Sequence, residues 1–235
     1  MIRKLLEALD RKERELRNSF GHDITDPVER KRSVQHMRWL DHGILRVYWH
    51  NFDQIAPGVF RSNQPDHKRF AAYAEQGIKT VLNLRGPAQQ PHYLFEVESC
   101  ARLGLTLVNL PMGARRAPDV ATLTALLDAF ATMDRPFLMH CKSGADRTGL
   151  AAAIYLMVQE GQPLEAVRKQ LSFRYIHIRR TATGILDHFL DVYGIRAAQS
   201  PITLDDWIRT EYDPAALTAS FAAKQAALKP WQGWR

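Results

Sequence analysis

The stretch His140-Cys141-Lys142-Ser143-Gly144-Ala145-Asp146-Arg147-Thr148-Gly149 joins two different kinds of segment and decides how the rest of the chain is interpreted. Residues 136–139 before it are apolar and predict a short buried strand. Residues 148–158 after it are rich in alanine and leucine and predict a helix. The stretch is therefore expected where a strand ends and a helix begins, a place where backbone N–H groups are unpaired and the helix dipole attracts negative charge. Such a loop is suited to hold a phosphate beside the Cys141 thiol.

The residue types in this loop match the chemistry of a thiolate nucleophile. A helix N-terminus and a nearby arginine can lower a thiol pKa from about 8.5 into the range of about 3.5–7.5. Arg147 presents a planar fork of donors to two phosphate oxygens, and Thr148 can donate its hydroxyl to the sulfur. Small residues let backbone amides curl around the remaining oxygens: Ser143, Gly144 and Ala145. The pattern predicts covalent catalysis, in which Cys141 attacks phosphorus and water then releases phosphate.

The spacing His-Cys-x5-Arg-Thr-Gly resembles the signature of the cysteine-dependent protein tyrosine phosphatase superfamily, in the version that bacterial dual-specificity and tyrosine/phosphoinositide phosphatases carry. The resemblance covers about Ile55 to Tyr193. Residues 59–65 are similar to the entry segment of that family, and residues 78–86 to its strand that runs into an arginine-bearing loop. The resemblance implies an α/β phosphatase domain and a His140 that orients the loop by hydrogen bonding. No metal or other cofactor is expected, because arginine and backbone amides do the work of a metal.

A phosphatase of this kind needs a general acid to protonate the leaving oxygen. Asp119 is the one carboxylate in residues 109–120, where many members of the family carry the acid on a mobile loop. Its place before a predicted helix also suits a helix N-terminal residue. Asp146 is the competitor, because related phosphatases with Asp-Arg-Thr in the loop are thought to use that aspartate. We favour Asp146, and the sequence leaves the choice open.

The rest of the chain alternates between strand and helix patterns, which predicts an α/β fold with a central, mainly parallel sheet flanked by helices. We expect one phosphatase domain at 55–195, with a helical extension at 1–54 and a helical appendage at 196–235. Strands are expected at 59–61, 79–84, 105–110 and 136–140, and in part of 38–51, whereas 22–36 is expected to be irregular. Helices are expected at 2–17, 66–76, 91–103, 119–133, 148–159, 163–172 and 181–192, from 203, and at 215–228.

The 235 residues carry a formal net charge of +7 and a sequence pI of about 9.6. Such a balance is typical of a solvated surface, and it can also steer anionic substrates toward a site. The candidate substrate-binding cations are Arg85, Lys142, Arg115 and Arg116, with the pair Arg179-Arg180 favoured less. No nucleic-acid motif is recognisable, so we expect no nucleic-acid partner.

The ends of the chain carry two further expectations. Residues 1–12 lack the apolar core of a signal peptide, and the two cysteines do not form a disulfide framework, so a cytoplasmic location is expected. The tail favours a packed helical appendage. Its Trp231 and Trp234, beside Lys229 and Arg235, leave a weak membrane-surface or oligomer contact as the alternative. The sequence does not predict an oligomeric state.

These features predict a protein tyrosine or dual-specificity phosphatase that acts on phosphorylated protein. One alternative substrate class is a phosphoinositide, an inositol phosphate or another lipid or sugar phosphate, which Lys142, Asp146 and the basic charge balance favour. A second alternative is a non-catalytic adaptor that binds phosphate. Pocket depth separates the substrates, because phosphotyrosine needs a deep, narrow pocket and the other groups suit a wide, shallow one.

Overall fold

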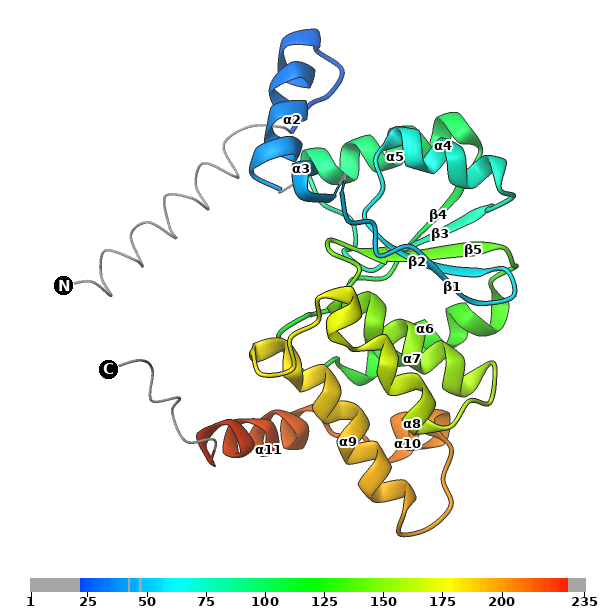
Figure 1. Cartoon of the computed structure of the whole chain (residues 1–235), viewed down its shortest axis with the longest axis vertical. Helices are drawn as coiled ribbons and strands as arrows, with labels where there is room; N and C mark the ends of the chain where they lie inside the picture. The colour runs from blue at the N-terminus through cyan, green and yellow to red at the C-terminus, as the bar shows by residue number, and fades with distance from the viewer. Residues whose placement is uncertain (1–21, 42, 47, 228–235) are drawn as a thin grey trace, which may run out of the picture.

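A computed structural model of the chain describes residues 22–41, 43–46 and 48–227, in which a five-stranded sheet lies between two layers of helices (Figure 1). The strands are β1 (Asp53–Ala56), β2 (Val59–Asn63), β3 (Thr80–Asn83), β4 (Thr106–Asn109) and β5 (Phe137–Cys141). Their order in the sheet is β1-β2-β5-β3-β4, and only the β1–β2 pair is antiparallel. The expected mainly parallel α/β sheet is confirmed.

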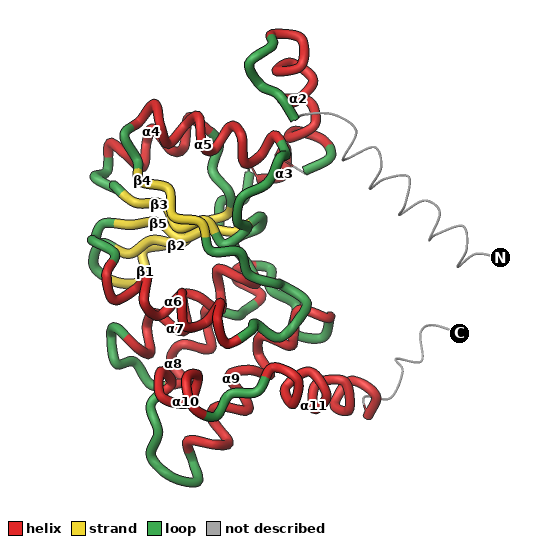
Figure 2. The backbone as a smooth tube through the Cα atoms, turned by 180° about the vertical axis from the view of Figure 1, so that it is seen from behind, coloured by secondary structure: helices red, strands yellow, loops and turns green. Residues whose placement is uncertain are grey.

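Helices cover both faces of this sheet, as Figure 2 shows from behind. One layer is formed by α4 (His67–Glu75) and α5 (Pro91–Leu103), with α2 (Pro27–Trp39) and α3 (Gly43–Arg46) at its end. The other layer contains α6 (Val120–Thr132), α7 (Asp146–Val158), α8 (Leu164–Val167), α9 (Ile185–Ala197), α10 (Leu204–Thr210) and α11 (Pro214–Ala227), joined in part by the 3₁₀ turns η1 (Arg168–Gln170), η2 (Phe173–Tyr175) and η3 (Ala182–Gly184). Within the described residues, no helix is long and apolar enough to cross a membrane.

Strand β5 occupies the centre of the sheet and is buried along its whole length. Phe137, Met139 and Cys141 alternate toward the main hydrophobic core, which lies on the side of α6 and α7. His140 points to the other side, where it meets Glu96 of α5. Because β2 and β3 run parallel to β5, the carboxyl ends of all three strands meet at one edge of the sheet. The loop after Cys141 leaves the sheet at this edge.

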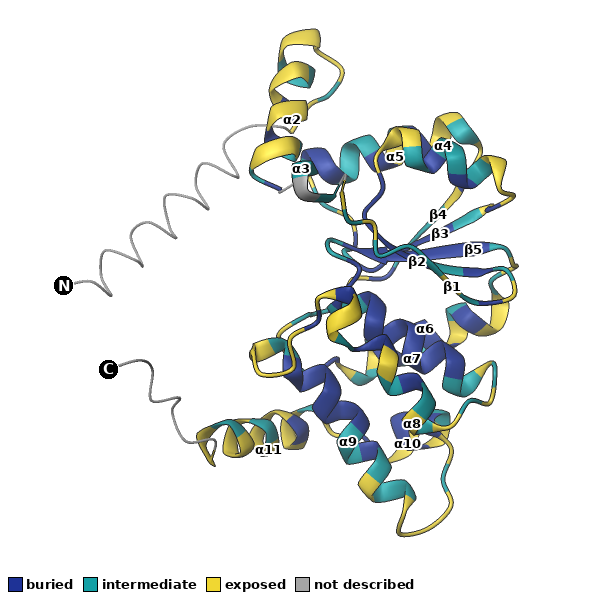
Figure 3. Ribbon diagram, viewed as in Figure 1, coloured by how far each residue is buried: buried dark blue, intermediate teal, exposed yellow. Residues whose placement is uncertain are grey.

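The main core continues from the sheet into the C-terminal helices. Helix α7 is buried on nearly all sides, as Figure 3 shows, because α6, α8, α9 and α10 surround it. Leu204, Trp207 and Leu217 belong to the same apolar cluster as β5 and α7. The Trp207 ring lies 5.2 Å from that of Phe189 and 5.1 Å from that of Tyr212, between ring centroids. Helices α10 and α11 therefore bury apolar side chains against the layer formed by α6, α7 and α9.

Two expectations about the N-terminal segment are wrong. Residues 22–36 are expected to be irregular, but α2 begins at Pro27 and takes in the rest of that segment. The Asp26 carboxylate accepts hydrogen bonds from the N–H groups of Val28 and Glu29, and Pro27 suits the first turn. No strand forms among the described residues of 38–51. The apolar Trp39 and Tyr48 there are 62% and 87% exposed, and the edge of the sheet is taken by β1, which the sequence did not predict.

The other elements follow the expected pattern with smaller differences. The helix expected at 163–172 is the short α8 followed by η1, and the helix expected at 181–192 begins later, at Ile185, and extends to Ala197. The helix expected from 203 is α10, which Thr203 caps by accepting a hydrogen bond from the N–H of Asp206. The helix expected at 2–17 and the tail residues 229–235 lie outside the described residues.

Candidate active site

The loop from Cys141 to Arg147, here named the 141–147 loop, connects the end of β5 to the first turn of α7. Its tightest point is Gly144, with a φ of +71°. A Cβ atom at Gly144 would lie 2.6 Å from backbone atoms of Ser62 and Asn63, at the end of β2. Glycine is therefore required here both by the left-handed conformation and by the close approach of two backbones.

A buried arginine supports the 141–147 loop from the side of β2. Arg61 is fully buried, and its guanidinium donates to the carbonyl oxygens of Gly144 at 2.5 Å and of Gln170 at 3.0 Å. The same guanidinium lies 3.5 Å from the centroid of the Tyr175 ring. Asn51 adds a second tie, because its Nδ2 donates to the carbonyl oxygens of Ser143 and Tyr175, both at 2.8 Å. These contacts hold the backbone of the loop, and the sequence patterns identified neither residue as part of the site.

The environment of Cys141 favours its thiolate. Burial by itself would raise the pKa of this thiol, which is 1% exposed. The charge of Arg147, together with hydrogen bonding from the hydroxyl and the backbone N–H of Thr148, outweighs burial and lowers the pKa below its ordinary value. Among the described residues, the buried Nε of Arg147 has no hydrogen-bond partner. Such an unpaired donor near a buried sulfur suits an incoming anion.

A cavity of about 720 Å³ opens over the 141–147 loop. Of the residues predicted to bind substrate, four line it: Lys142, Ser143, Arg115 and Arg116. The other four do not line it: Gly144, Ala145, Thr148 and Arg85. Arg115 and Arg116, both exposed, reach the cavity from the segment before α6. Its lining residues are Asp41, Arg46, Trp49, Gly113, Ala114, Arg115, Arg116, Lys142, Ser143, Asp146, Arg147 and Thr183.

Asp41 is a component of this site that sequence patterns did not reveal. It comes from the N-terminal segment and lies 2.8 Å from Arg46, 3.0 Å from Arg85 and 3.2 Å from Lys142, measured between nitrogen and oxygen atoms. Burial would raise the pKa of the Asp41 carboxyl, but the three cations hold it far below its usual range. Arg85 is therefore engaged by Asp41 and does not line the cavity, while Lys142 does.

A second buried chain of polar groups runs behind Cys141. His140 Nε2 lies 2.6 Å from Glu96 Oε1, and Gln64 donates from Nε2 to Glu96 Oε2 at 2.7 Å. The side-chain oxygen of Gln64 in turn accepts from Arg85. His140 Nδ1 also lies 3.3 Å from the carbonyl oxygen of Cys141. His140 thus connects the start of the loop to α5, in agreement with the orienting part that the resemblance implied.

Comparison with known proteins places this arrangement in a family. Residues 53–183 match the family model described as "DSP-PTPase phosphatase fused to NAD+ Kinase". The chain belongs to this family. The match contains all five strands and the whole 141–147 loop, so the resemblance to cysteine-dependent phosphatases is confirmed.

Individual phosphatases are also similar to this chain. The dual specificity protein phosphatase TpbA of Pseudomonas aeruginosa (strain UCBPP-PA14) is 30% identical over 125 residues, which are 52% of this chain and 53% of TpbA. The chain thus spans about half the length of that relative. Protein tyrosine phosphatase domain-containing protein 1 of Mus musculus is 31% identical over 97 residues, 35% of this chain and 13% of that protein. The core catalytic domain of the PP-IP phosphatase Siw14 from S. cerevisiae shares the fold, with a TM-score of 0.50 and 20% identity over 64% of this chain and 93% of that one.

The two candidate acids of this phosphatase domain have different surroundings. Asp119 caps α6 and accepts hydrogen bonds from the N–H of Thr122 at 2.7 Å and from its hydroxyl at 2.9 Å, which lower its pKa. Asp146 lines the cavity in the first turn of α7, and its Oδ1 lies 2.7 Å from His177 Nδ1. Of the two, only Asp146 lies beside Arg147 at the cavity. No group of three or more His, Cys, Asp or Glu residues suited to a metal ion occurs in the part of the chain that the structure describes.

Proposed function

We propose that this chain hydrolyses phosphate monoesters through a phosphocysteine intermediate. The observation that carries the proposal is the buried Cys141, whose pKa is lowered by Arg147 and Thr148, at the start of a loop whose Lys142 and Arg147 line a cavity with other cations. The backbone of the 141–147 loop and the fork of Arg147 would hold the phosphate oxygens, with Ser143, Gly144 and Ala145 leaving room for them. Membership of a phosphatase family supports the same reaction.

In the first step of the proposed mechanism, the Cys141 sulfur forms a bond to phosphorus while the bond from phosphorus to the leaving oxygen breaks. Asp146 gives its proton to that oxygen, which leaves as an alcohol or a phenol. In the second step, the Asp146 carboxylate takes a proton from water as the water oxygen attacks phosphorus. The S–P bond breaks, phosphate forms and Cys141 returns to the thiolate, which Arg147 and Thr148 stabilise.

The substrate class that we favour is phosphotyrosine or phosphoserine/threonine in protein. The relationship to TpbA, a dual specificity protein phosphatase by its name, supports it. A second class has its own observation: Arg46, Arg115, Arg116 and Lys142 line the cavity together with Arg147. Several cations around one cavity suit a substrate with more than one phosphate, such as an inositol phosphate or a phosphoinositide headgroup.

A substrate panel with active-site variants tests this proposal. We expect wild-type protein to hydrolyse p-nitrophenyl phosphate and the Cys141→Ser variant to lose that activity, with unchanged thermal unfolding. Turnover of phosphopeptides and of inositol phosphates is then compared to decide between the two substrate classes. If wild-type protein binds phosphopeptides but turns over no phosphate ester, the chain is an adaptor and the proposed reaction is wrong.

Three further expectations stay predictions. They are the cytoplasmic location, the substrate-binding part of Arg85, and the division of the chain at residues 54 and 195. Arg85 fits better as a support for Lys142 through Asp41, because Asp41 and Gln64 already occupy its donors.

A further inference from the structure

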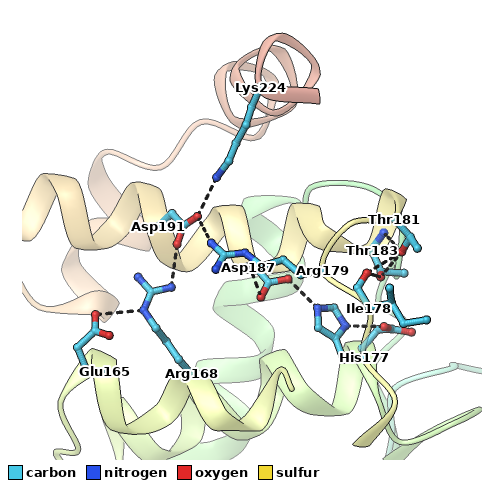
Figure 4. A network of polar contacts seen from close by, with 11 residues as sticks. Glu165, Arg168, His177, Ile178, Arg179, Thr181, Thr183, Asp187, Asp191 and Lys224 are labelled. Atoms are coloured by element: carbon cyan, nitrogen blue, oxygen red, sulfur yellow. Dashed lines mark hydrogen bonds and ion pairs between the residues drawn. The ribbon is translucent and has the colours of Figure 1, made fainter. Parts of the chain in front are cut away.

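His177 lies between two carboxylates, one of which belongs to the candidate active site. Its Nδ1 lies 2.7 Å from Asp146 Oδ1, and its Nε2 lies 2.6 Å from Asp187 Oδ2. The His177 side chain is only 1% exposed, so water cannot substitute for either partner. Figure 4 shows His177 pointing toward Asp187 of α9. The imidazole therefore bridges the start of α7 and the start of α9, and the proposed reaction does not by itself account for this contact.

The segment that carries His177 is attached to the same supports as the 141–147 loop. Tyr175 lies under the Arg61 guanidinium, and its carbonyl oxygen accepts from Asn51. Ile176 then adopts a left-handed φ of 62°, and the N–H of His177 donates to the carbonyl oxygen of Ser172 at 3.2 Å. Because Arg61 and Asn51 also bind the 141–147 loop, the position of His177 relative to Asp146 is set by shared contacts.

An outer layer of charges supports Asp187 on its far side. Arg179 Nε lies 3.8 Å from Asp187 Oδ1 and Arg179 also binds Asp191 at 2.7 Å. Two more cations form ion pairs with Asp191: Arg168 at 2.8 Å and Lys224 of α11 at 3.1 Å (Figure 4). The Asp187 carboxylate is thus held in place, and His177 with it, by contacts that reach the C-terminal helix.

The protonation of His177 follows from its two partners. Asp146 Oδ1 accepts a hydrogen bond whether or not Oδ2 carries a proton, and the Asp187 carboxylate only accepts, so the imidazole can satisfy both only by donating from both ring nitrogens. Burial would lower the pKa of His177, but the hydrogen bonds and charges of these two aspartates raise it to about 9. The charged groups that face the ring are Asp146 from α7 and Asp187 from α9, with Arg179 beyond Asp187. At neutral pH His177 is therefore a fixed donor to Asp146 Oδ1.

We propose that His177 is a positioning residue that holds Asp146 by one carboxyl oxygen and leaves the other oxygen to carry the proton of the reaction. This inference rests on the proposed function, in which Asp146 is the acid. Within residues 22–41, 43–46 and 48–227, Asp146 Oδ2 makes no hydrogen bond, and Asp146 lines the cavity. His177 keeps both of its protons throughout. The proton on Oδ2 goes to the leaving oxygen in the first step, and Oδ2 takes a proton from water in the second.

Leaving-group dependence tests this inference, because a general acid matters most when the leaving oxygen is basic. The variants are His177→Gln, whose amide can reach only toward Asp187, and His177→Asn, whose shorter amide can still donate toward Asp146. We expect His177→Gln to lose on the order of 10- to 100-fold in kcat on phenyl phosphate and much less on p-nitrophenyl phosphate. His177→Asn should recover part of the loss, and His177→Gln should add little further loss to Asp146→Asn.

His188→Gln is the matched control. His188 is a buried histidine next to Asp187 in sequence, but its Nε2 binds Ser220 at 2.9 Å and not Asp146. We expect this variant to lower thermal stability without changing the ratio of the two rates. The ratio compared is kcat on phenyl phosphate to kcat on p-nitrophenyl phosphate. If Asp146→Asn changes this ratio but both His177 variants keep the wild-type value, His177 does not position Asp146, and the proposed function still stands. No turnover by wild-type protein would overturn both.

In a separate readout, ¹⁵N NMR at pH 8 should show the His177 ring protonated at both nitrogens, and a neutral ring would also contradict the inference.

Discussion

The close approach of Gly144 to β2 predicts that replacing it by alanine inactivates the site by a specific displacement. Alanine at a φ of +71° costs about 1–2 kcal/mol, because the left-handed conformation brings Cβ too close to the carbonyl oxygen. The added Cβ would also lie 2.6 Å from backbone atoms of Ser62 and Asn63. Backbone atoms cannot rotate away as a flexible side chain can, so the 141–147 loop has to lift by about 1 Å to reach an ordinary contact.

A displacement of this size has a calculable effect on turnover. Moving a reacting group by about 1 Å can cost about 10²-fold in rate. The same movement stretches the hydrogen bond from Arg61 to the carbonyl oxygen of Gly144, and a bond to a charged donor contributes about 1.5–3 kcal/mol. We therefore expect Gly144→Ala to lose at least about 10²-fold in kcat on p-nitrophenyl phosphate and to unfold at lower denaturant concentration.

Gly104→Ala is the matched control for backbone strain. Gly104 has nearly the same φ, +66°, but a Cβ there would meet no atom within 4 Å. This variant should lower the free energy of unfolding in urea by about 1–2 kcal/mol and keep the wild-type kcat. If Gly144→Ala matched Gly104→Ala in both stability and kcat, the loop would not need its close contact with β2, and the reasoning would be wrong.

Three further predictions concern the thiol, the buried histidine and the C-terminal helix. Arg147→Met should raise the pKa of Cys141 and slow its alkylation by iodoacetamide near pH 7, with Cys100, whose pKa burial raises to about 12, as the unreactive internal standard. Folding raises the pKa of His177 from 6.5 to about 9, so the protonated ring should contribute about 3 kcal/mol to the free energy of unfolding. This contribution should be fully present below pH 6.5 and lost as the pH rises through 9. Denaturant titrations of His177→Gln should lack this loss at alkaline pH. Leu217→Ala should lower the free energy of unfolding by about 2–5 kcal/mol, since Leu217 is buried in the main core; a loss below 1 kcal/mol would show that α11 does not share that core.

The residues of the candidate site that lie close together in sequence could be predicted from the sequence alone. Cys141, Arg147 and Thr148 are brought together by one strand, one tight loop and one helix start, so their spacing encodes their geometry. The same holds for the caps at Asp119 and Thr203, where a side-chain oxygen accepts from an N–H group three residues ahead. The N-terminal segment differs from its predicted structure, because an apolar run predicts a buried strand only where the sheet has room for it, and Trp39 and Tyr48 stay exposed.

The partners of these residues depended on the tertiary structure. Arg61 reaches Gly144 across 83 residues of sequence, Glu96 reaches His140 across 44, and His177 reaches Asp146 across 31. Arg61 reaches Gly144 because β2 lies beside β5 in the sheet, and Glu96 reaches His140 because α5 packs on the face of the sheet opposite α7. Local spacing determines which chemical groups line a loop, whereas the burial and charge around them come from segments that meet only when the sheet and its two helical layers assemble.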